Sequence, residues 1–193
     1  MTAEASPGKM QREVAVEKEG KFYRARYDGF DLKLLPFHAN RLVREWDIWK
    51  MYYAPIDLKG KTVLDVGAGC LETAVFYLGK GAAKIVCVEN NPDAVTIAKE
   101  NIQAYPQMKV ELLNEPVSLE QLKLPHDFLK MNVEGAESIL LDYDGKLGPC
   151  VIEAYKIGLW DIPKALMEKF PELKPVYSET NQIMPATILQ GIS

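Results

Sequence analysis

The sequence predicts an α/β fold in which helices cover both faces of a mostly parallel β-sheet. From about residue 58 onward, short apolar segments alternate with segments of helical periodicity, as is typical of parallel strands joined by crossover helices. The chain has 193 residues, which suits one domain with a small addition. Five segments are expected to form the strands: Thr62–Val66, Ile85–Glu89, Val110–Leu113, Phe128–Met131 and Val151–Glu153.

The helices of this region have recognisable ends. Asn91 can cap a helix that Pro92 begins, because proline fits the first helical turn. The last two apolar segments, Pro175–Ser178 and Ala186–Gln190, are joined by a short polar stretch, so we expect an antiparallel hairpin at the sheet edge. Further helices are expected over Leu71–Leu78, Ala136–Asp142 and Ile162–Phe170.

The first 57 residues are expected to form a small region ahead of the main domain, which spans residues 58–193. Residues 1–12 are predicted to be a flexible tail. Residues 13–57 are predicted to contain a β-meander and a helix, because apolar and charged side chains alternate at first. Turns of this meander are expected at Glu17–Lys21 and at Asp28-Gly29.

The helix of the amino-terminal region carries an aromatic stripe. Its residues recur at intervals of three and four positions, which is helical spacing, and Pro55 is expected to end the helix. We expect the stripe to pack against the core, the alternative being a lid over a ligand. The stripe consists of Leu42, Trp46, Trp49 and Tyr53.

Composition is typical of a soluble globular protein. Hydrophobic residues make up 48% and charged residues 26%, which excludes a disordered or collagen-like chain. The net charge of −4 argues against a dedicated nucleic-acid-binding protein. No apolar run approaches the roughly 20 residues that span a bilayer, and the charged first residues do not resemble a signal peptide. We therefore expect a cytoplasmic protein with no membrane partner.

The cysteines and histidines do not suggest a metal site. Cys70, Cys87 and Cys150 are far apart and lie in or beside apolar segments, so small buried side chains are expected. Only two histidines, His38 and His126, accompany them. No paired spacing typical of zinc ligands is present, and we predict no metal.

One segment has the pattern of an adenosine-binding site. The apolar strand ending at Val66 leads into Gly67-Ala-Gly69 and then into a helix, and glycines allow both the tight turn and the close approach of a ligand. The next predicted strand ends in Glu89, 20 residues after Gly69. A carboxylate at that strand end can accept hydrogen bonds from both hydroxyls of an adenosine ribose.

Two classes of cofactor contain such an adenosine. A dinucleotide site requires a third glycine where pyrophosphate meets the helix, and this chain has Glu72 there. S-adenosylmethionine has no phosphate and carries a positive sulfonium, which suits the acidic side chains of Asp65 and Glu72. Methyl transfer is therefore favoured over a nicotinamide-dependent oxidation. The alternative role for Asp65 and Glu72 is electrostatic stabilisation of the start of the helix alone.

Three motifs resemble known methyltransferases. Leu58–Gly69 (LKGKTVLDVGAG) and Val88–Pro92 (VENNP) look like the first two motifs of class I S-adenosylmethionine-dependent methyltransferases. Asp127–Glu137 (DFLKMNVEGAE) is similar to the fourth-strand signature of FkbM-type methyltransferases, which mainly methylate hydroxyls of sugars and related metabolites. The resemblance spans about residues 58–155 and implies a Rossmann-like methyltransferase sheet. The family more often has Asp at position 132 and Asn at position 69, where this chain has Asn132 and Gly69.

The resemblance implies a set of residues that bind S-adenosylmethionine and its product S-adenosylhomocysteine. The loop ending at Gly69 would line the methionine part, and Glu89 would hold the ribose. Asn90 and Asn114 would lie near the adenine, and Asn132 would face the cofactor from the fourth strand. The full set is Asp65, Gly67, Ala68, Gly69, Glu72, Thr73, Glu89, Asn90, Asn114 and Asn132.

Two carboxylates are candidates for a catalytic base. Glu134 and Glu153 both lie at the carboxyl end of a predicted strand, where open α/β sheets bind ligands. A base would be required if the acceptor is a hydroxyl. The alternative roles are a helix cap for Glu134 and a solvated strand end for Glu153. His126 precedes its strand, so we expect it at the opposite edge of the sheet.

The predicted acceptor is a small molecule, such as a metabolite or sugar, methylated on oxygen rather than nitrogen. An RNA methyltransferase is the main alternative, although Asn132–Gly135 lacks the Asn/Asp-Pro-Pro-aromatic motif of enzymes that methylate exocyclic amines. Lys9–Arg26 holds six basic and three acidic residues, which we attribute to an exposed hairpin face. A non-catalytic cofactor-binding subunit and a homo-oligomer are left open, and the meander is expected to cap the active site.

Overall fold

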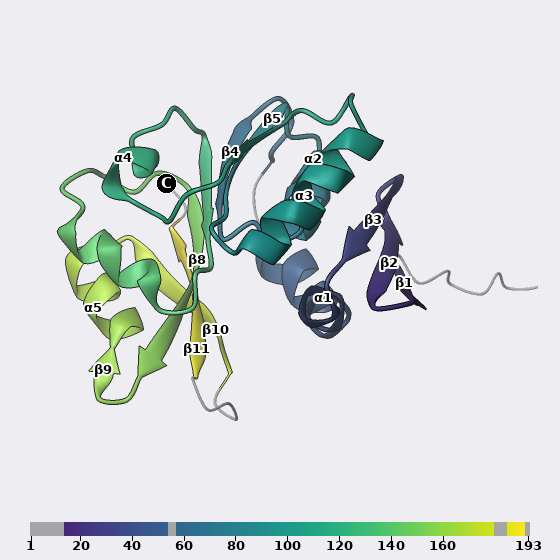
Figure 1. The fold of residues 1–193 in the computed structure, drawn as a ribbon. Coiled ribbons are helices and arrows are strands. Elements are labelled where there is room, and N and C mark those ends of the chain that lie inside the picture. The colour runs from purple at the N-terminus through teal and green to yellow at the C-terminus, as the bar shows by residue number, and fades with distance from the viewer. Residues whose placement is uncertain (1–13, 54–56, 180–184, 192–193) are drawn as a thin grey trace, which may run out of the picture.

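The computed structural model describes residues 14–53, 57–179 and 185–191. The predicted tail over residues 1–12 and the predicted helix end at Pro55 lie outside these ranges. Within them the chain forms a central eight-stranded sheet with helices on both faces and, beside it, a three-stranded antiparallel sheet (Figure 1). The predicted α/β class is confirmed.

The central sheet contains every predicted strand. Its strands are β4 (Thr62–Val66), β5 (Lys84–Val88), β6 (Val110–Leu113), β7 (Phe128–Met131), β8 (Cys150–Ile157), β9 (Trp160–Asp161), β10 (Leu173–Glu179) and β11 (Ala186–Gly191). Their order is β10-β11-β8-β7-β4-β5-β6, with β9 paired to β8. Neighbours from β8 to β6 are parallel, whereas β11 is antiparallel to β8 and β10, as predicted for the final hairpin.

Helices on the two faces of the sheet bury two separate cores. One face is covered by α2 (Glu72–Gly79) and α3 (Pro92–Ala104), and the other by α4 (Leu119–Leu122), a 3₁₀ helix (Ala136–Asp142) and α5 (Ile162–Lys169) (Figure 1). Successive strand side chains point to opposite faces. Val63 therefore joins the core with α2, and Leu64 joins the core with α5.

The amino-terminal meander consists of β1 (Ala15–Glu19), β2 (Phe22–Tyr27) and β3 (Phe30–Leu34). The turn predicted over Glu17–Lys21 is wrong at its start, because β1 continues through Glu19. Arginines of β2 form cross-strand ion pairs with the β1 carboxylates at 2.7 and 3.0 Å. Such pairs favour an extended conformation in a charged segment that would otherwise suit a turn.

The aromatic stripe packs on the core, as predicted. It lies on α1 (Pro36–Ile48) and on the π-helical turn Trp49–Tyr53 that continues it. The rings of Trp46 and Trp49 meet Phe76 of α2 edge-on, with centroids 5.7 and 5.9 Å apart. The amino-terminal region thus shares one hydrophobic core with α2 and α3.

Some short elements were not predicted. The helix α4 and the strand β9 are only four and two residues long, and the segment predicted as a helix over Ala136–Asp142 is a 3₁₀ helix. Elements of this length contain too few residues for a periodic pattern. None of the helices in the described ranges is long and apolar enough to cross a lipid bilayer.

Candidate active site

A cavity of about 610 Å³ lies at the carboxyl ends of the central parallel strands. Its walls come from the start of α1, the glycine loop after β4, the end of β5, and the loops after β6 and β7. This edge of an open α/β sheet is where such folds bind ligands. Six of the ten predicted cofactor residues line the cavity: Gly67, Gly69, Glu72, Glu89, Asn90 and Asn132.

The glycine loop brings the backbone of β4 directly against the cavity. Gly67 has a φ of +77°, and a Cβ there would lie 1.9 Å from the backbone oxygen of Asn132. Gly69 has a φ of +58°, and its Cβ would lie 2.6 Å from the ring of His38. Position 67 therefore requires glycine for conformation and for space, whereas a Cβ at Gly69 would require the side chains of His38 and Glu72 to move.

Asp65 supports this loop from beneath and does not line the cavity. Its carboxylate is fully buried, with Lys130 of β7 at 2.8 Å and the hydroxyl of Thr73 donating a hydrogen bond of 2.6 Å. Burial raises the pKa of Asp65, although Lys130 opposes this effect. Lys130 also donates to the backbone oxygen of Gly67 at 2.7 Å. Asp65, Thr73 and Lys130 therefore position the loop, and Ala68 is likewise buried outside the cavity wall.

Glu89 connects the end of β5 to the glycine loop. One carboxylate oxygen accepts the N–H of Gly69 at 2.8 Å, and the other accepts the N–H groups of Asn90 and Asn91 at 2.9 and 2.8 Å. The side chain is half-buried and faces the cavity. Its position at the end of the second parallel strand is the one predicted for the ribose-binding acid.

Of the two residues predicted near the adenine, one lines the cavity and the other does not. Asn90 lines the cavity and is exposed, whereas Asn114 lies outside the wall and donates to the backbone oxygen of Glu89 at 3.4 Å. The following residues, Glu115, Pro116 and Val117, line the cavity instead. The placement of Asn114 near the adenine therefore stays a prediction.

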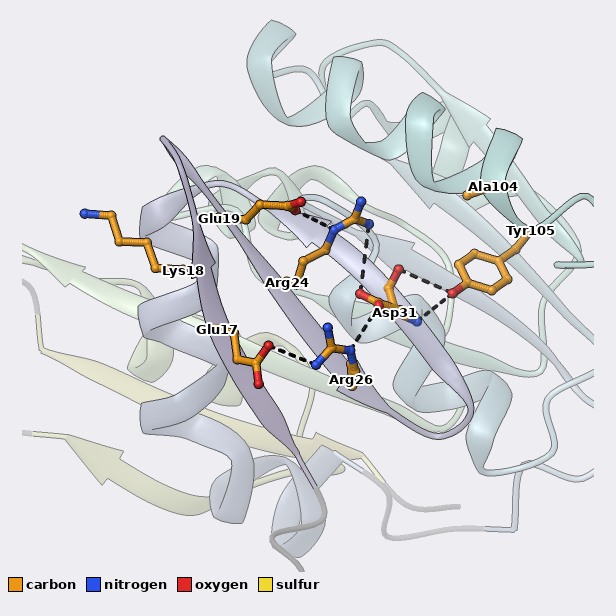
Figure 2. A pocket seen from close by; sticks show the side chains of 8 residues that line it. All are labelled: Glu17, Lys18, Glu19, Arg24, Arg26, Asp31, Ala104 and Tyr105. Atoms are coloured by element: carbon orange, nitrogen blue, oxygen red, sulfur yellow. Dashed lines mark hydrogen bonds and ion pairs between the residues drawn. The ribbon is translucent and has the colours of Figure 1, made fainter.

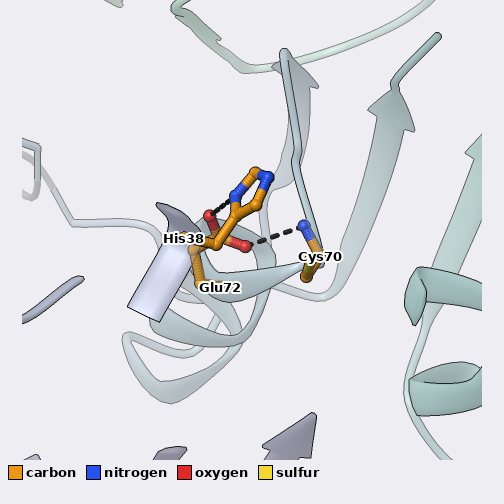
Figure 3. A group of neighbouring side chains, drawn as sticks. All are labelled: His38, Cys70 and Glu72. Atoms are coloured by element: carbon orange, nitrogen blue, oxygen red, sulfur yellow. Dashed lines mark hydrogen bonds and ion pairs between the residues drawn. The ribbon is translucent and has the colours of Figure 1, made fainter. Parts of the chain in front are cut away.

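Glu72 forms a charged pair with His38 at the cavity wall (Figure 3). His38 Nδ1 lies 2.5 Å from Glu72 Oε1, and the N–H of Cys70 donates to Glu72 Oε2 at 2.8 Å. Burial acts to raise the pKa of Glu72, but His38 lowers it below its usual value. Burial acts to lower the pKa of His38, yet Glu72 raises it. His38 was not predicted as a site residue, because 34 positions separate it from Glu72.

Glu153 lies behind the cavity wall in a saturated hydrogen-bond network. Its carboxylate accepts from Tyr53 at 2.5 Å, from Tyr155 at 2.8 Å, from Arg41 at 3.2 Å and from the amide of Asn132. Three of these bonds are to Oε2 and one, from Tyr155, is to Oε1, so the carboxylate holds its neighbours in place. The sequence reasoning did not include Arg41, which lines the cavity from α1.

Glu134 is the predicted base that lies at the cavity. Its backbone is left-handed, with a φ of +52°, and its side chain is exposed at the wall. Glu137 fixes this loop, since its carboxylate accepts the N–H groups of Val133 and Gly135, each at 2.7 Å. Burial raises the pKa of Glu137 to about 7. Among the described residues, none forms a hydrogen bond or ion pair with the Glu134 carboxylate.

A second hollow, of about 540 Å³, lies against the amino-terminal meander (Figure 2). Arg24 pairs there with Glu19 at 2.7 Å, and Arg26 pairs with Glu17 and with Asp31, each at 3.0 Å. The arginines are thus neutralised by neighbouring carboxylates. This arrangement agrees with an exposed hairpin face and does not form a basic surface for phosphates.

Known methyltransferases are similar to this chain in sequence and in fold. The ribosomal protein L11 methyltransferase of Tolumonas auensis is 30% identical over 135 residues, 68% of this chain and 43% of that protein. Among solved structures, yhhF of Escherichia coli, to which methyltransferase activity has been ascribed, has a TM-score of 0.60 at 17% identity, over 86% of this chain and 93% of that one. Magnesium protoporphyrin IX methyltransferase of Synechocystis PCC 6803, solved with bound S-adenosylmethionine, has a TM-score of 0.56 at 16% identity, over 80% of each chain. The chain has the methyltransferase fold.

These similarities are partial. No protein-family model matches the chain. The chain spans between 16% and 60% of the length of the curated relatives it matches. None of the three proteins described above supports the FkbM-type assignment that Asp127–Glu137 suggested, so that finer assignment stays a prediction.

Proposed function

We propose that this chain is a methyltransferase that binds S-adenosylmethionine in the 610 Å³ cavity. The observation that carries the proposal is the position of Glu89, at the end of β5 and hydrogen-bonded to the glycine loop at Gly69. A ribose with two hydroxyl donors suits this carboxylate. The buried acid Glu72 at the start of α2 disfavours a pyrophosphate and favours a ligand with a positive sulfonium. The fold shared with a structure that contains S-adenosylmethionine supports the same cofactor.

The residues of the chain would contribute mainly by positioning. The methyl group passes in line from sulfur to the acceptor, and correct orientation of two reactants supplies roughly 7–11 kcal/mol of barrier reduction. Gly67 and Gly69 allow the cofactor to approach the backbone. Glu134 is the carboxylate best placed to take a proton from the acceptor, since it faces the cavity and has no partner among the described residues.

The class of methyl acceptor that we propose is broader than the one predicted from the sequence. The predicted acceptor was the oxygen of a small metabolite, with nucleic acid disfavoured. A relative that covers 68% of this chain is named for its action on a ribosomal protein, so a macromolecular acceptor stands beside the predicted small molecule. The half-open cavity, bounded by exposed Glu134 and Asn90, leaves either class access to the cofactor.

Thermal unfolding with added ligands tests the cofactor directly. A ligand at 100 times its dissociation constant stabilises a protein by roughly 2.7 kcal/mol, which for a chain of this size corresponds to a rise in Tm of about 5–10 °C. We expect this rise with S-adenosylmethionine and S-adenosylhomocysteine, and none with NAD. A rise with NAD alone would overturn the proposal.

The matched variants are Glu89→Ala and Glu168→Ala. Glu89→Ala should abolish the ligand-induced rise in Tm, because the ribose loses its acceptor and the N–H of Gly69 loses its partner. Glu168 is an exposed carboxylate on α5, away from the cavity, and its replacement should leave the rise unchanged. An equal ligand-induced rise in Tm in the two variants would show that the cofactor binds elsewhere.

A further inference from the structure

We propose that His38, Cys70 and Glu72 form a zinc site at the wall of the cavity (Figure 3). Each side chain offers one ligand atom, and the imidazole nitrogen, the thiol sulfur and a carboxylate oxygen all lie within 4.8 Å of one another. No metal site was predicted from the sequence, because the ligands come from α1, from the glycine loop and from the first turn of α2. The proposal concerns metal binding alone; because an ion on Glu72 would cancel the charge that favours a sulfonium in the same cavity, Zn²⁺ and S-adenosylmethionine are expected to compete.

The donor set selects the type of metal. One sulfur, one imidazole nitrogen and one carboxylate oxygen match the ligands that Zn²⁺ takes in proteins. Mg²⁺ and Ca²⁺ prefer sites built from oxygen atoms alone, so the sulfur and nitrogen argue against both.

The ligand atoms would have to shift to reach the spacing that a tetrahedral ion requires. Zinc–ligand bonds of about 2.0–2.3 Å place neighbouring ligand atoms about 3.3–3.6 Å apart. The three ligand atoms lie within 4.8 Å of one another, and those of His38 and Glu72 are 2.5 Å apart and would separate by about 1 Å. The two side chains line the cavity wall.

Three protein ligands leave the fourth position open. In tetrahedral zinc sites with three protein ligands, a water molecule or another small ligand completes the shell. Two of the three ligands, His38 and Glu72, line the cavity. The bound ion would fasten α1 to the glycine loop and so fix one wall of the cavity.

Cobalt(II) is the probe that tests the site. Co²⁺ replaces Zn²⁺ in tetrahedral sites, and a thiolate ligand gives it a charge-transfer absorption band in the near ultraviolet. We expect chelator-treated full-length protein to bind one Co²⁺ per chain with this band, and added Zn²⁺ to displace it. Cys70→Ser should remove the band and weaken Zn²⁺ binding by at least 100-fold, the upper end of the 10–100-fold loss typical of outer-shell changes.

Cys150→Ser is the matched control, because this thiol is also buried but lies in the core on the opposite face of the sheet. It should keep the band and the affinity for Zn²⁺. His38→Ala should also weaken Zn²⁺ binding, and circular dichroism without metal would show that each variant is folded. Absence of the band in the unaltered protein, or its survival in Cys70→Ser, would overturn the proposal.

Discussion

At the scale of single residues, Gly67 shows how conformation and space combine in the glycine loop. Gly67→Ala would force a side chain into a left-handed backbone and to within 1.9 Å of the Asn132 backbone oxygen. We expect a loss of at least about 1–3 kcal/mol in the free energy of unfolding, measured by chemical denaturation. Gly148→Ala is the control, since an added Cβ there meets no atom within 4 Å. Similar losses in both variants would contradict the argument.

Glu153, a predicted candidate base, lies in a buried hydrogen-bond network. Its carboxylate accepts hydrogen bonds from two tyrosines and from Arg41, so removing it takes away a buried acceptor, while Arg41 keeps its ion pair with Glu45 at 2.8 Å. We expect Glu153→Ala to lower the free energy of unfolding by about 1–3 kcal/mol. Denaturant titration beside Glu168→Ala measures this. If Glu153→Ala kept normal stability but lost methyl transfer, the original prediction of a base would be restored.

At the scale of elements, the loop between β7 and the 3₁₀ helix Ala136–Asp142 is sensitive to pH through Glu137. Burial raises the folded-state pKa of Glu137 to about 7, from a usual value of 4.5. The folded state therefore binds the Glu137 proton more tightly than the unfolded state does. The stabilisation that this protonation contributes is complete below about pH 4.5 and is lost as the pH rises through 7.

The Glu137→Gln variant tests this pH dependence. It cannot ionise, so the stability of the unaltered protein relative to the variant should fall between about pH 5 and pH 8, by a few kcal/mol at most. Chemical denaturation at the two pH values measures the difference, in the presence of a chelator so that metal binding plays no part. A constant difference between the two proteins would show that the Glu137 pKa is not raised.

Elements with a long, regular pattern were predictable, and pairings between distant elements were not. The helix α3 was located from its cap at Asn91 and from Pro92, and the structure confirms that the Asn91 side chain accepts from two backbone N–H groups. The site residues on the strand ends followed from the same logic, as Glu89 shows. His38 and Arg41 were missed because nothing local in the sequence of α1 indicates which strand ends it will face.

At the scale of the whole molecule, the amino-terminal region and residues 58–193 are consecutive along the chain but share one hydrophobic core. Trp46 and Trp49 pack against Phe76, and the backbone N–H of Lys33 donates to Asn101 of α3 at 2.9 Å. The meander and α1 are thus held by the helices of the main domain. α1 supplies part of the cavity wall, whereas no residue of β1, β2 or β3 lines it, so the expectation that the meander caps the active site stays a prediction.

The contact between the first helical region and the last strand has a consequence for synthesis. Gln190 of β11 donates a side-chain hydrogen bond to the backbone oxygen of Tyr52, 138 residues earlier in the chain. A ribosome adds about 5–20 residues per second, so Gln190 is synthesised roughly 7–28 s after Tyr52. During that interval the aromatic residues of α1 lack part of their final cover, and the nascent chain is open to chaperones.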